Sequence, residues 1–144
     1  MNAGLAVARS KAIDSARVTF QRADAYLLPA FERKFTAGLG AFWWSHVPKA
    51  RLNSFLSGFH HVLSRGAKVV FFDNRYVAGS STPISQIDES RNTYQERRLE
   101  NASVHQVLKN FPSESELRGA VDGAAVEVKV ELLTYYWILS YVLR

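Results

Sequence analysis

The pattern of apolar and polar positions divides the first third of the chain into three expected elements. Residues 4–12 are rich in alanine and predict a short helix. The segment 17–23 alternates apolar and polar side chains, which predicts a short strand followed by a loop through Pro29. Residues 36–44 form an almost continuous apolar run, which is typical of a strand that is buried on both faces of a sheet.

The middle of the chain predicts a strand–helix–strand unit. Between Lys49 and Arg65 the apolar positions recur at helical spacing, and they are Leu52, Phe55, Leu56, Phe59, Val62 and Leu63. Gly66 is placed to end this helix in the left-handed conformation. Residues 67–73 then predict a second buried strand. A strand, a helix and a strand in this order form a βαβ unit, whose crossover should be right-handed.

A long segment, residues 75–112, separates that second strand from the next helix. A structureless loop of this length is uncommon in a compact domain. Within the segment, residues 93–99 and 104–110 alternate apolar and polar side chains and flank a short turn. We therefore expect an inserted hairpin here.

The end of the chain predicts a helix and a pair of strands. Ser113 and Glu116 form a capping box, which begins a helix that runs to Gly123. Residues 126–133 and 135–143 are two β-rich runs joined tightly, so they should pair antiparallel. The predicted fold class is therefore α/β, with an open, doubly wound, Rossmann-like sheet that is mostly parallel and ends in an antiparallel hairpin.

Composition and charge narrow the class of protein. The chain has 144 residues, of which 47% are hydrophobic and 22% charged, as in one ordinary globular domain. A formal net charge of +5, spread along the chain, indicates anionic ligands or solubility more than nucleic-acid binding. The lack of cysteine excludes disulfides, thiolate metal ligands and thiol nucleophiles. The four histidines lack metal-binding spacing, so we expect no metal site.

Two further absences concern the location of the protein. No apolar run is long enough for a membrane span, and the longest one, residues 132–143, contains Thr and Ser. The N-terminus has no basic and then apolar signal pattern. We therefore expect a cytoplasmic protein with no membrane partner.

The motifs between residues 2 and 73 follow one another in the order seen in a known enzyme family. Residues 35–48, FTAGLGAFWWSHVP, precede the amphipathic helix, and residues 66–73, GAKVVFFD, follow it. Residues 18–26 resemble that family's third strand with its trailing Asp-Ala, and residues 2–11 resemble the helix after its second strand. With the antiparallel ending, this order resembles the second half of the class I S-adenosylmethionine-dependent methyltransferases.

The same resemblance shows what the sequence lacks. The family's first strand with its Gly-rich loop has no counterpart, and neither has the acidic residue that ends its second strand and binds the ribose. Gly38 and Gly40 match G-x-G by letters only, because they lie within a strand and precede no helix. Thr36 stands where an Asp is common in the family. We therefore interpret residues 1–144 as a single, partial methyltransferase domain that lacks its N-terminal part and carries a lid at about 75–112.

The resemblance implies S-adenosylmethionine as the cofactor, bound beyond the carboxyl ends of the strands. Asp24 would accept a hydrogen bond from the adenine amino group, with the Ala25 N–H facing a ring nitrogen and Tyr26 packing nearby. The alternative for Asp24 is that it only caps a turn. The residues implied at the methionine end are Ala41, Phe42 and Trp43. The alternative for the tryptophan is a place in the core.

His46 is the candidate catalytic base. It is the only histidine at the carboxyl end of a predicted strand, near the expected position of the methyl group. The alternative is that the His-Val-Pro tripeptide only begins the next helix, because many methyl transfers need no protein base.

The inserted hairpin and its root carry the candidate acceptor residues, which are Arg75, Tyr76, Tyr94, Arg97 and Arg98. Arginine forks suit carboxylate and phosphate groups, so the expected partner is a small, anionic methyl acceptor. The alternative is a solvated basic hairpin. The predicted function is methyl transfer to a small molecule. A non-catalytic methyltransferase-like module for binding or oligomerisation is the alternative, and a basic nucleic-acid-associated domain is a third possibility.

The missing strands imply an open edge. In the family's sheet the strand order is 3-2-1-4-5-7-6, so two absent strands would separate segment 18–23 from segment 37–44. Without them, the apolar edge of 37–44 is free to pair with another chain. We expect a homodimer through this edge or, as the next choice, direct pairing of 18–23 with 37–44.

Overall fold

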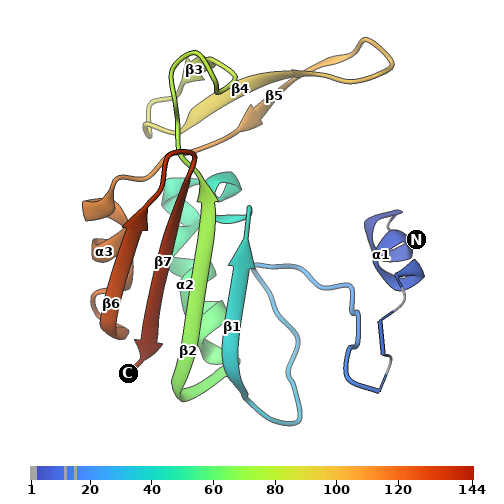
Figure 1. Cartoon of the computed structure of the whole chain (residues 1–144), viewed down its shortest axis with the longest axis vertical. Coiled ribbons are helices and arrows are strands. Elements are labelled where there is room, and N and C mark those ends of the chain that lie inside the picture. The colour runs from blue at the N-terminus through green and yellow to red at the C-terminus, as the bar shows by residue number, and fades with distance from the viewer. Residues whose placement is uncertain (1–2, 12, 15) are drawn as a thin grey trace.

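The computed structural model describes residues 3–11, 13–14 and 16–144, and a four-stranded sheet lies at its centre (Figure 1). The strand order is β1-β2-β7-β6, with β1 at Phe35–Ala41, β2 at Leu63–Asn74, β7 at Tyr136–Leu143 and β6 at Ala125–Leu132. β1 runs parallel to β2, and β7 runs antiparallel to both of its neighbours. This is the order of the last four strands of the expected sheet, so the α/β fold class and the terminal antiparallel pair are confirmed.

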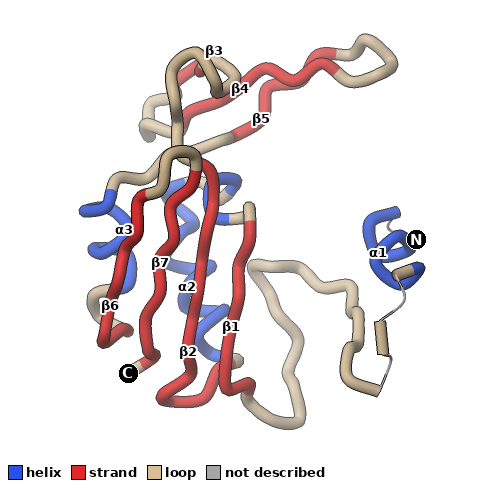
Figure 2. Tube along the Cα trace, viewed as in Figure 1, coloured by secondary structure: helices blue, strands red, loops and turns tan. Residues whose placement is uncertain are grey.

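Two helices cover one face of this sheet, whereas no helix of the described residues lies on its other face (Figures 1 and 2). They are α2 at Leu52–His61, which follows the 3₁₀ turns η1 (Trp44–His46) and η2 (Lys49–Arg51), and α3 at Glu114–Val121. The helices bury apolar side chains against β2 and β7, and removing this apolar surface from water drives the packing. The predicted capping box is present, because Ser113 and Glu116 each accept a hydrogen bond from the other's backbone N–H.

The two glycines of β1 serve packing. A Cβ at Gly38 would lie 2.7 Å from the Phe59 ring, and a Cβ at Gly40 would lie 2.3 Å from the Phe71 ring. Glycine therefore lets these two rings approach the strand closely. This explains the G-x-G letters without a dinucleotide-binding loop.

The N-terminal segment departs from the sequence prediction. The helix α1 at Ala3–Ser10 is present, but it buries no side chain and lies apart from the sheet (Figure 1). The strand predicted at 17–23 is wrong, because this segment enters no ladder and is followed only by an isolated bridge between Asp24 and Leu27. A strand needs a partner for its backbone groups, and β1 does not pair with this segment. Direct pairing of 18–23 with 37–44 is therefore also wrong.

The expected burial of residues 36–44 on both faces is wrong as well. β1 ends at Ala41, is the edge strand of the sheet and is exposed over most of its length. The edge is apolar, and Leu39 keeps 65% of its surface exposed. The register pairs Leu39 with Val70, and Phe72 with Ile138, so these side chains share the face that no helix covers.

The helix predicted over 49–65 is shorter in the structure. It ends at His61, and β2 begins at Leu63, because Phe35 of β1 already pairs with Leu63. Gly66 therefore does not cap the helix but lies inside β2, where its φ of +80° requires the freedom of glycine.

A second, three-stranded antiparallel sheet extends beyond the carboxyl end of β2 (Figure 1). It contains β3 at Ile84–Ile87, β4 at Thr93–Arg98 and β5 at Val104–Leu108. The hairpin predicted from the alternating pattern is confirmed by β4 and β5, whereas β3 was not predicted. No helix among the residues that the structure describes is long and apolar enough to cross a membrane.

Candidate active site

A fully buried carboxylate stands near the carboxyl end of β2. Asp73 Oδ1 lies 3.0 Å from Lys109 Nζ and accepts a hydrogen bond from the Asn74 N–H, and Oδ2 accepts one from the Ser45 N–H at 3.0 Å. Lys109 also donates to Asn74 Oδ1 at 3.0 Å and is itself only 5% exposed. A buried ion pair is tolerated only when further hydrogen bonds satisfy its atoms, as they do here. The contact joins the ends of β1 and β2 to the root of the hairpin.

His46 is half-buried in η1, beside the same hairpin root. Its Nδ1 lies 2.8 Å from the carbonyl oxygen of Leu108. A carbonyl oxygen can only accept, so Nδ1 carries the hydrogen, and Nε2 of the neutral ring keeps an unprotonated lone pair. This is the tautomer that a base acting through Nε2 requires.

A cavity of about 400 Å³ opens at the carboxyl end of the sheet. Among the described residues that line it none is acidic, and the cationic and aromatic ones are Arg75, Arg97, Lys109, Phe111, Tyr135 and Tyr136. Because Lys109 is paired with Asp73, the unbalanced positive charge comes from the two arginines. Arg75 donates to the Leu133 carbonyl, whereas the Arg97 side chain has no partner among the described residues. The cavity suits an anionic group.

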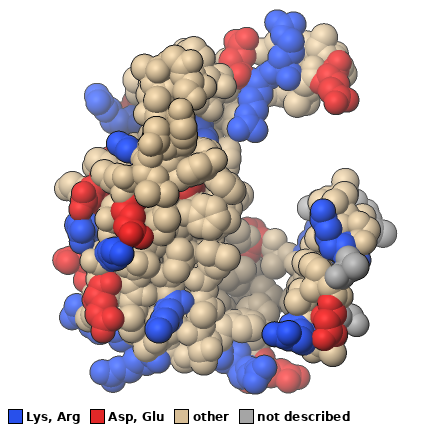
Figure 3. Space-filling view, viewed as in Figure 1, with Lys and Arg blue, Asp and Glu red and all other residues tan. Residues whose placement is uncertain are grey.

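The structure thus brings together two of the five residues predicted to bind the acceptor. Tyr76 instead packs against Phe111, with ring centroids 5.3 Å apart, and does not line this cavity. Tyr94 donates from its hydroxyl to Asp88 at 3.0 Å, and this hydrogen bond raises the pKa of Tyr94. Arg98 lies exposed on the hairpin, where Figure 3 shows basic side chains beside acidic ones.

The predicted adenine residues lie on the side of the sheet that the helices cover. Asp24 is exposed, and its Oδ1 accepts a hydrogen bond from the Tyr26 N–H at 2.9 Å, so it caps a turn. Ala25 and Tyr26 are half-buried against the core. The Tyr26 ring centroid lies 6.1 Å from that of Trp43, and the Arg51 guanidinium carbon lies 3.4 Å from the centre of the Tyr26 ring.

The three residues predicted at the methionine end of the cofactor lie in different places in the structure. Ala41 is exposed at the free edge. Phe42 has a φ of +54° and packs against Phe72, with ring centroids 5.1 Å apart, on the uncovered face. Trp43 packs on the opposite side. Neither its buried Nε1 nor the buried Ser45 Oγ has a hydrogen-bond partner in the part of the chain that the structure describes. The chain therefore does not enclose all three residues in one site.

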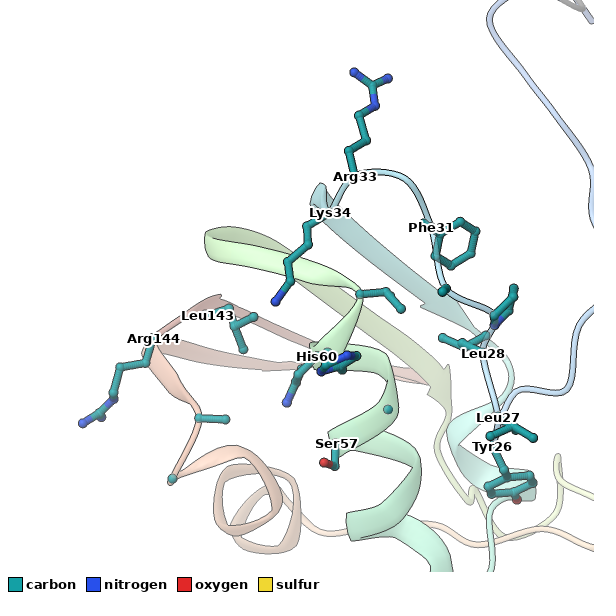
Figure 4. A pocket seen from close by; sticks show the side chains of 17 residues that line it. Tyr26, Leu27, Leu28, Phe31, Arg33, Lys34, Ser57, His60, Leu143 and Arg144 are labelled. Atoms are coloured by element: carbon teal, nitrogen blue, oxygen red, sulfur yellow. The ribbon is translucent and has the colours of Figure 1, made fainter.

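A second cavity, of about 820 Å³, lies at the opposite end of the sheet, between the loop 26–34 and the end of α2. Figure 4 shows Lys34 extending toward His60 and Leu143, whereas Arg33 points away. His60 Nε2 lies 2.6 Å from the hydroxyl oxygen of Tyr141, and burial lowers the pKa of His60. Ligands of such sheets bind beyond the carboxyl ends of the strands, so this cavity is not part of the candidate active site.

Sequence reasoning did not identify Lys109, which anchors the buried carboxylate. Its only local signal is that Lys109 and Asn110 are two polar residues in succession at the end of an alternating strand. Two successive polar residues usually indicate a solvent-exposed segment. The contact of Lys109 with Asp73 is long-range, so no local pattern indicates it.

Solved structures share this fold. DhpI, solved as a complex with SAH, is 20% identical over 85% of this chain, which covers 53% of DhpI, with a TM-score of 0.63. A protein from Pyrococcus horikoshii is 17% identical, with coverages of 98% and 66% and a TM-score of 0.69. The glycopeptide N-methyltransferase MtfA, complexed with S-adenosyl-L-methionine, is 13% identical, with coverages of 98% and 71% and a TM-score of 0.65. The sequence matches no protein-family model and no curated protein.

These similarities establish the fold. The chain has the fold of S-adenosylmethionine-dependent methyltransferases, as the sequence resemblance implied. It spans about half of the length of DhpI. At these identities the likeness is one of architecture, and function must be argued from the site.

Proposed function

We propose that this chain forms part of an S-adenosylmethionine-dependent methyltransferase that acts on a small, anionic molecule. The observation that carries the proposal is the grouping at the carboxyl end of the sheet. His46 lies beside the hairpin root with no partner for Nε2 among the described residues. A cavity with two unbalanced arginines, Arg75 and Arg97, opens at the same end, although His46 is not among the residues that line it. The fold supports the proposal, because sheets of this type bind their ligands at this end.

The cofactor would supply a methyl group activated on a sulfonium, so the protein mainly has to bind and orient the reactants. Asp24, Ala25 and Tyr26 would hold the adenine, and the second carboxylate oxygen of Asp24 has no partner among the described residues. Ala41, Phe42 and Trp43 would border the methionine end from the two sides on which they lie, and the buried Trp43 Nε1 would have to become exposed to reach it. These groups fit part of the cofactor only. We propose that full binding needs the Gly-rich strand-loop and the ribose-binding acid, which these 144 residues do not contain.

The chain's own residues would then divide the chemistry between them. Arg97 and Arg75 would bind the negative charge of the acceptor, with Arg98 and the hydroxyls of Tyr76 and Tyr94 at the margin of the site. His46 Nε2 would take the proton that the acceptor oxygen or nitrogen loses as its bond to the methyl group forms. The hairpin would keep water away from that step.

Cofactor binding by two forms of the protein tests the proposal. We expect the 144-residue chain alone to bind S-adenosylhomocysteine weakly or not at all in calorimetry, because each missing polar anchor contributes roughly 1–3 kcal/mol. If the DNA upstream of Met1 encodes the missing strand-loop in frame, the longer protein should bind at micromolar concentration and methylate small anions. Asp24→Ala should weaken its binding, whereas the control Asp14→Ala, another exposed turn residue, should not.

Two results would contradict these expectations. Micromolar binding by the 144-residue chain would refute the need for a further segment. Failure of the longer protein to bind, or an equal effect of the two Asp substitutions, would refute the methyltransferase proposal itself.

For the 144-residue chain on its own, we also propose a homodimer through β1. The strand FTAGLGA contains no charged residue and no proline, which are the usual protections of an edge strand. Leu39 on this strand and Phe42 just after it remain 65% and 46% exposed. Leu39→Lys should convert a dimer to a monomer in light scattering, whereas Leu99→Lys, at the exposed tip of the hairpin, should leave the dimer intact. A monomeric unmodified chain would refute this proposal.

A further inference from the structure

A buried pair of amides lies at the root of the hairpin. Asn92 and Asn110 are only 5% and 6% exposed. Asn110 Nδ2 donates to Asn92 Oδ1 at 3.0 Å, and Asn110 Oδ1 accepts from the Thr93 N–H at 2.9 Å. The two strands of the hairpin are thereby joined to each other where they leave the body of the protein.

The same two amides also reach the segment that carries His46. Asn92 Oδ1 accepts from the Lys49 N–H at 2.9 Å. Asn110 donates from Nδ2 to the Val47 carbonyl at 3.2 Å and from its backbone N–H to the Ser45 carbonyl at 2.7 Å. Segment 45–49 is therefore held at its beginning, middle and end by two side chains and one backbone group.

This arrangement differs from a hinge. A hinge lies where few buried contacts and many exposed backbone bonds allow local opening. Here the Asn92 and Asn110 amides lie out of water, so a movement of the hairpin would leave their donors and acceptors unsatisfied. His46 would lose its partner in the same movement, because the carbonyl it contacts belongs to Leu108 of β5.

We infer that Asn110, together with Asn92, is a positioning residue that makes the hairpin a fixed wall of the site and holds His46 with Nε2 free. The role of His46 in methyl transfer rests on the proposed function. The fixed hairpin and the tautomer of His46 do not, because they follow from contacts of the chain with itself. The Lys109–Asp73 pair also reaches segment 45–49, through the Ser45 N–H that Asp73 Oδ2 accepts, but only at its first residue. The asparagine amides hold Val47 and Lys49 as well.

The test measures the His46 ring and the hairpin amides in the 144-residue chain, without cofactor or acceptor. ¹⁵N shifts of the imidazole should show one tautomer, with the hydrogen on Nδ1, in the unmodified chain at a pH where the ring is neutral. In Asn110→Ala they should show a mixture of tautomers, and hydrogen exchange in β4 and β5 should accelerate roughly tenfold or more, while β7 is unchanged. The control Asn53→Ala, exposed on α2, should match the unmodified chain.

A second variant covers the case in which Asn110→Ala does not fold. Asn92→Ala keeps the Asn110 bonds to Ser45 and Val47, so it should fold and accelerate exchange in the hairpin by a smaller factor. A folded variant that keeps both the single tautomer and the slow exchange would overturn the inference, as would a mixture of tautomers in the unmodified chain. Failure of cofactor binding in the longer protein would refute the proposed function and leave this result unaffected.

Discussion

The two ends of the central sheet are built differently. At the carboxyl end, the side chains of Asp73, Asn92, Lys109 and Asn110 are almost completely buried and have hydrogen-bond or ionic partners, whereas the buried Ser45 hydroxyl has none among the described residues. At the amino end, a cavity of about 820 Å³ separates the loop 26–34 from α2, and a polar contact there joins the half-buried His60 to the buried Tyr141.

This difference indicates where the relative positions of the structural elements are most tightly defined. Apolar packing alone can stabilise a domain, and a buried ion pair is often no more stabilising than apolar residues of similar volume. Buried polar groups do, however, require particular partners, so they define one geometry for the elements that they join. The chain concentrates such groups where β1, β2 and the hairpin meet, which is the end proposed to carry the chemistry.

The largest effect on stability is expected at the carboxyl end. Lys109→Met leaves the Asp73 carboxylate buried without its ionic partner, and we expect this to lower the free energy of unfolding by about 3–5 kcal/mol. The matched control is Lys129→Met, because Lys129 forms a 3.0 Å pair with Glu131 but is 66% exposed. That variant should differ by less than about 1 kcal/mol in urea denaturation.

The double variant Lys109→Met, Asp73→Asn sharpens this prediction. Removing both charges should recover most of the lost stability, because no buried carboxylate then lacks a partner. If Lys109→Met and Lys129→Met had the same small effect, the contrast between the two ends of the sheet would disappear.

A smaller, pH-dependent effect is expected at the amino end. Burial lowers the pKa of His60 below its usual 6.5. At a pH between the lowered pKa of the folded chain and 6.5, His60 therefore binds a proton in the unfolded chain but not in the folded chain. Stability should therefore fall as the pH decreases through about 6.5. His60→Gln should remove part of this dependence, and His61→Gln, its exposed neighbour, should not. Urea titrations on both sides of that pH provide the measurement, and an unchanged profile in His60→Gln would contradict it.

The smallest effect is expected in the N-terminal arm. Deletion of residues 1–11 should change the free energy of unfolding by less than ~0.5 kcal/mol, because α1 buries no side chain. Its Arg9 side chain donates a hydrogen bond to the Phe20 carbonyl, which is exposed to solvent and contributes little. Tyr26→Ala should cost more, since Tyr26 packs against Trp43 and Phe55. A large loss of stability on deletion would show that the arm belongs to the folded core.

Elements with local signals were predicted well from the sequence. The capping box at Ser113, the helical stripe from Leu52 to Phe59 and the alternation at 93–110 each specify their element through neighbours within a few residues, although the helix ends before the predicted residue 65. The prediction of a strand at 17–23 is wrong because an alternating pattern favours an extended segment but does not provide a neighbouring strand for it to pair with. β1 does form, but it pairs only with β2 and is an edge strand. Its predicted burial on both faces is wrong because the apolar pattern does not specify how many neighbours the strand has.

The candidate site shows the same limit. The placement of Arg75 and Arg97 in one cavity follows from their positions at a strand end and on the hairpin above it. The partnership of Lys109 with Asp73 spans 36 positions of sequence. No spacing rule covers such a contact, because register and hairpin orientation, which depend on the whole sheet, decide it.

The free tip of the hairpin has a practical consequence. The turn closes with a hydrogen bond from the Leu99 N–H to the Ser103 carbonyl, and Ala102 adopts a φ of +65° in full contact with solvent. Because the amides that hold the hairpin lie at the other end of its strands, a protease cut or an inserted tag at the tip would leave them untouched. A cut at this turn would therefore leave two fragments that the central sheet and these amides hold together beside the candidate active site.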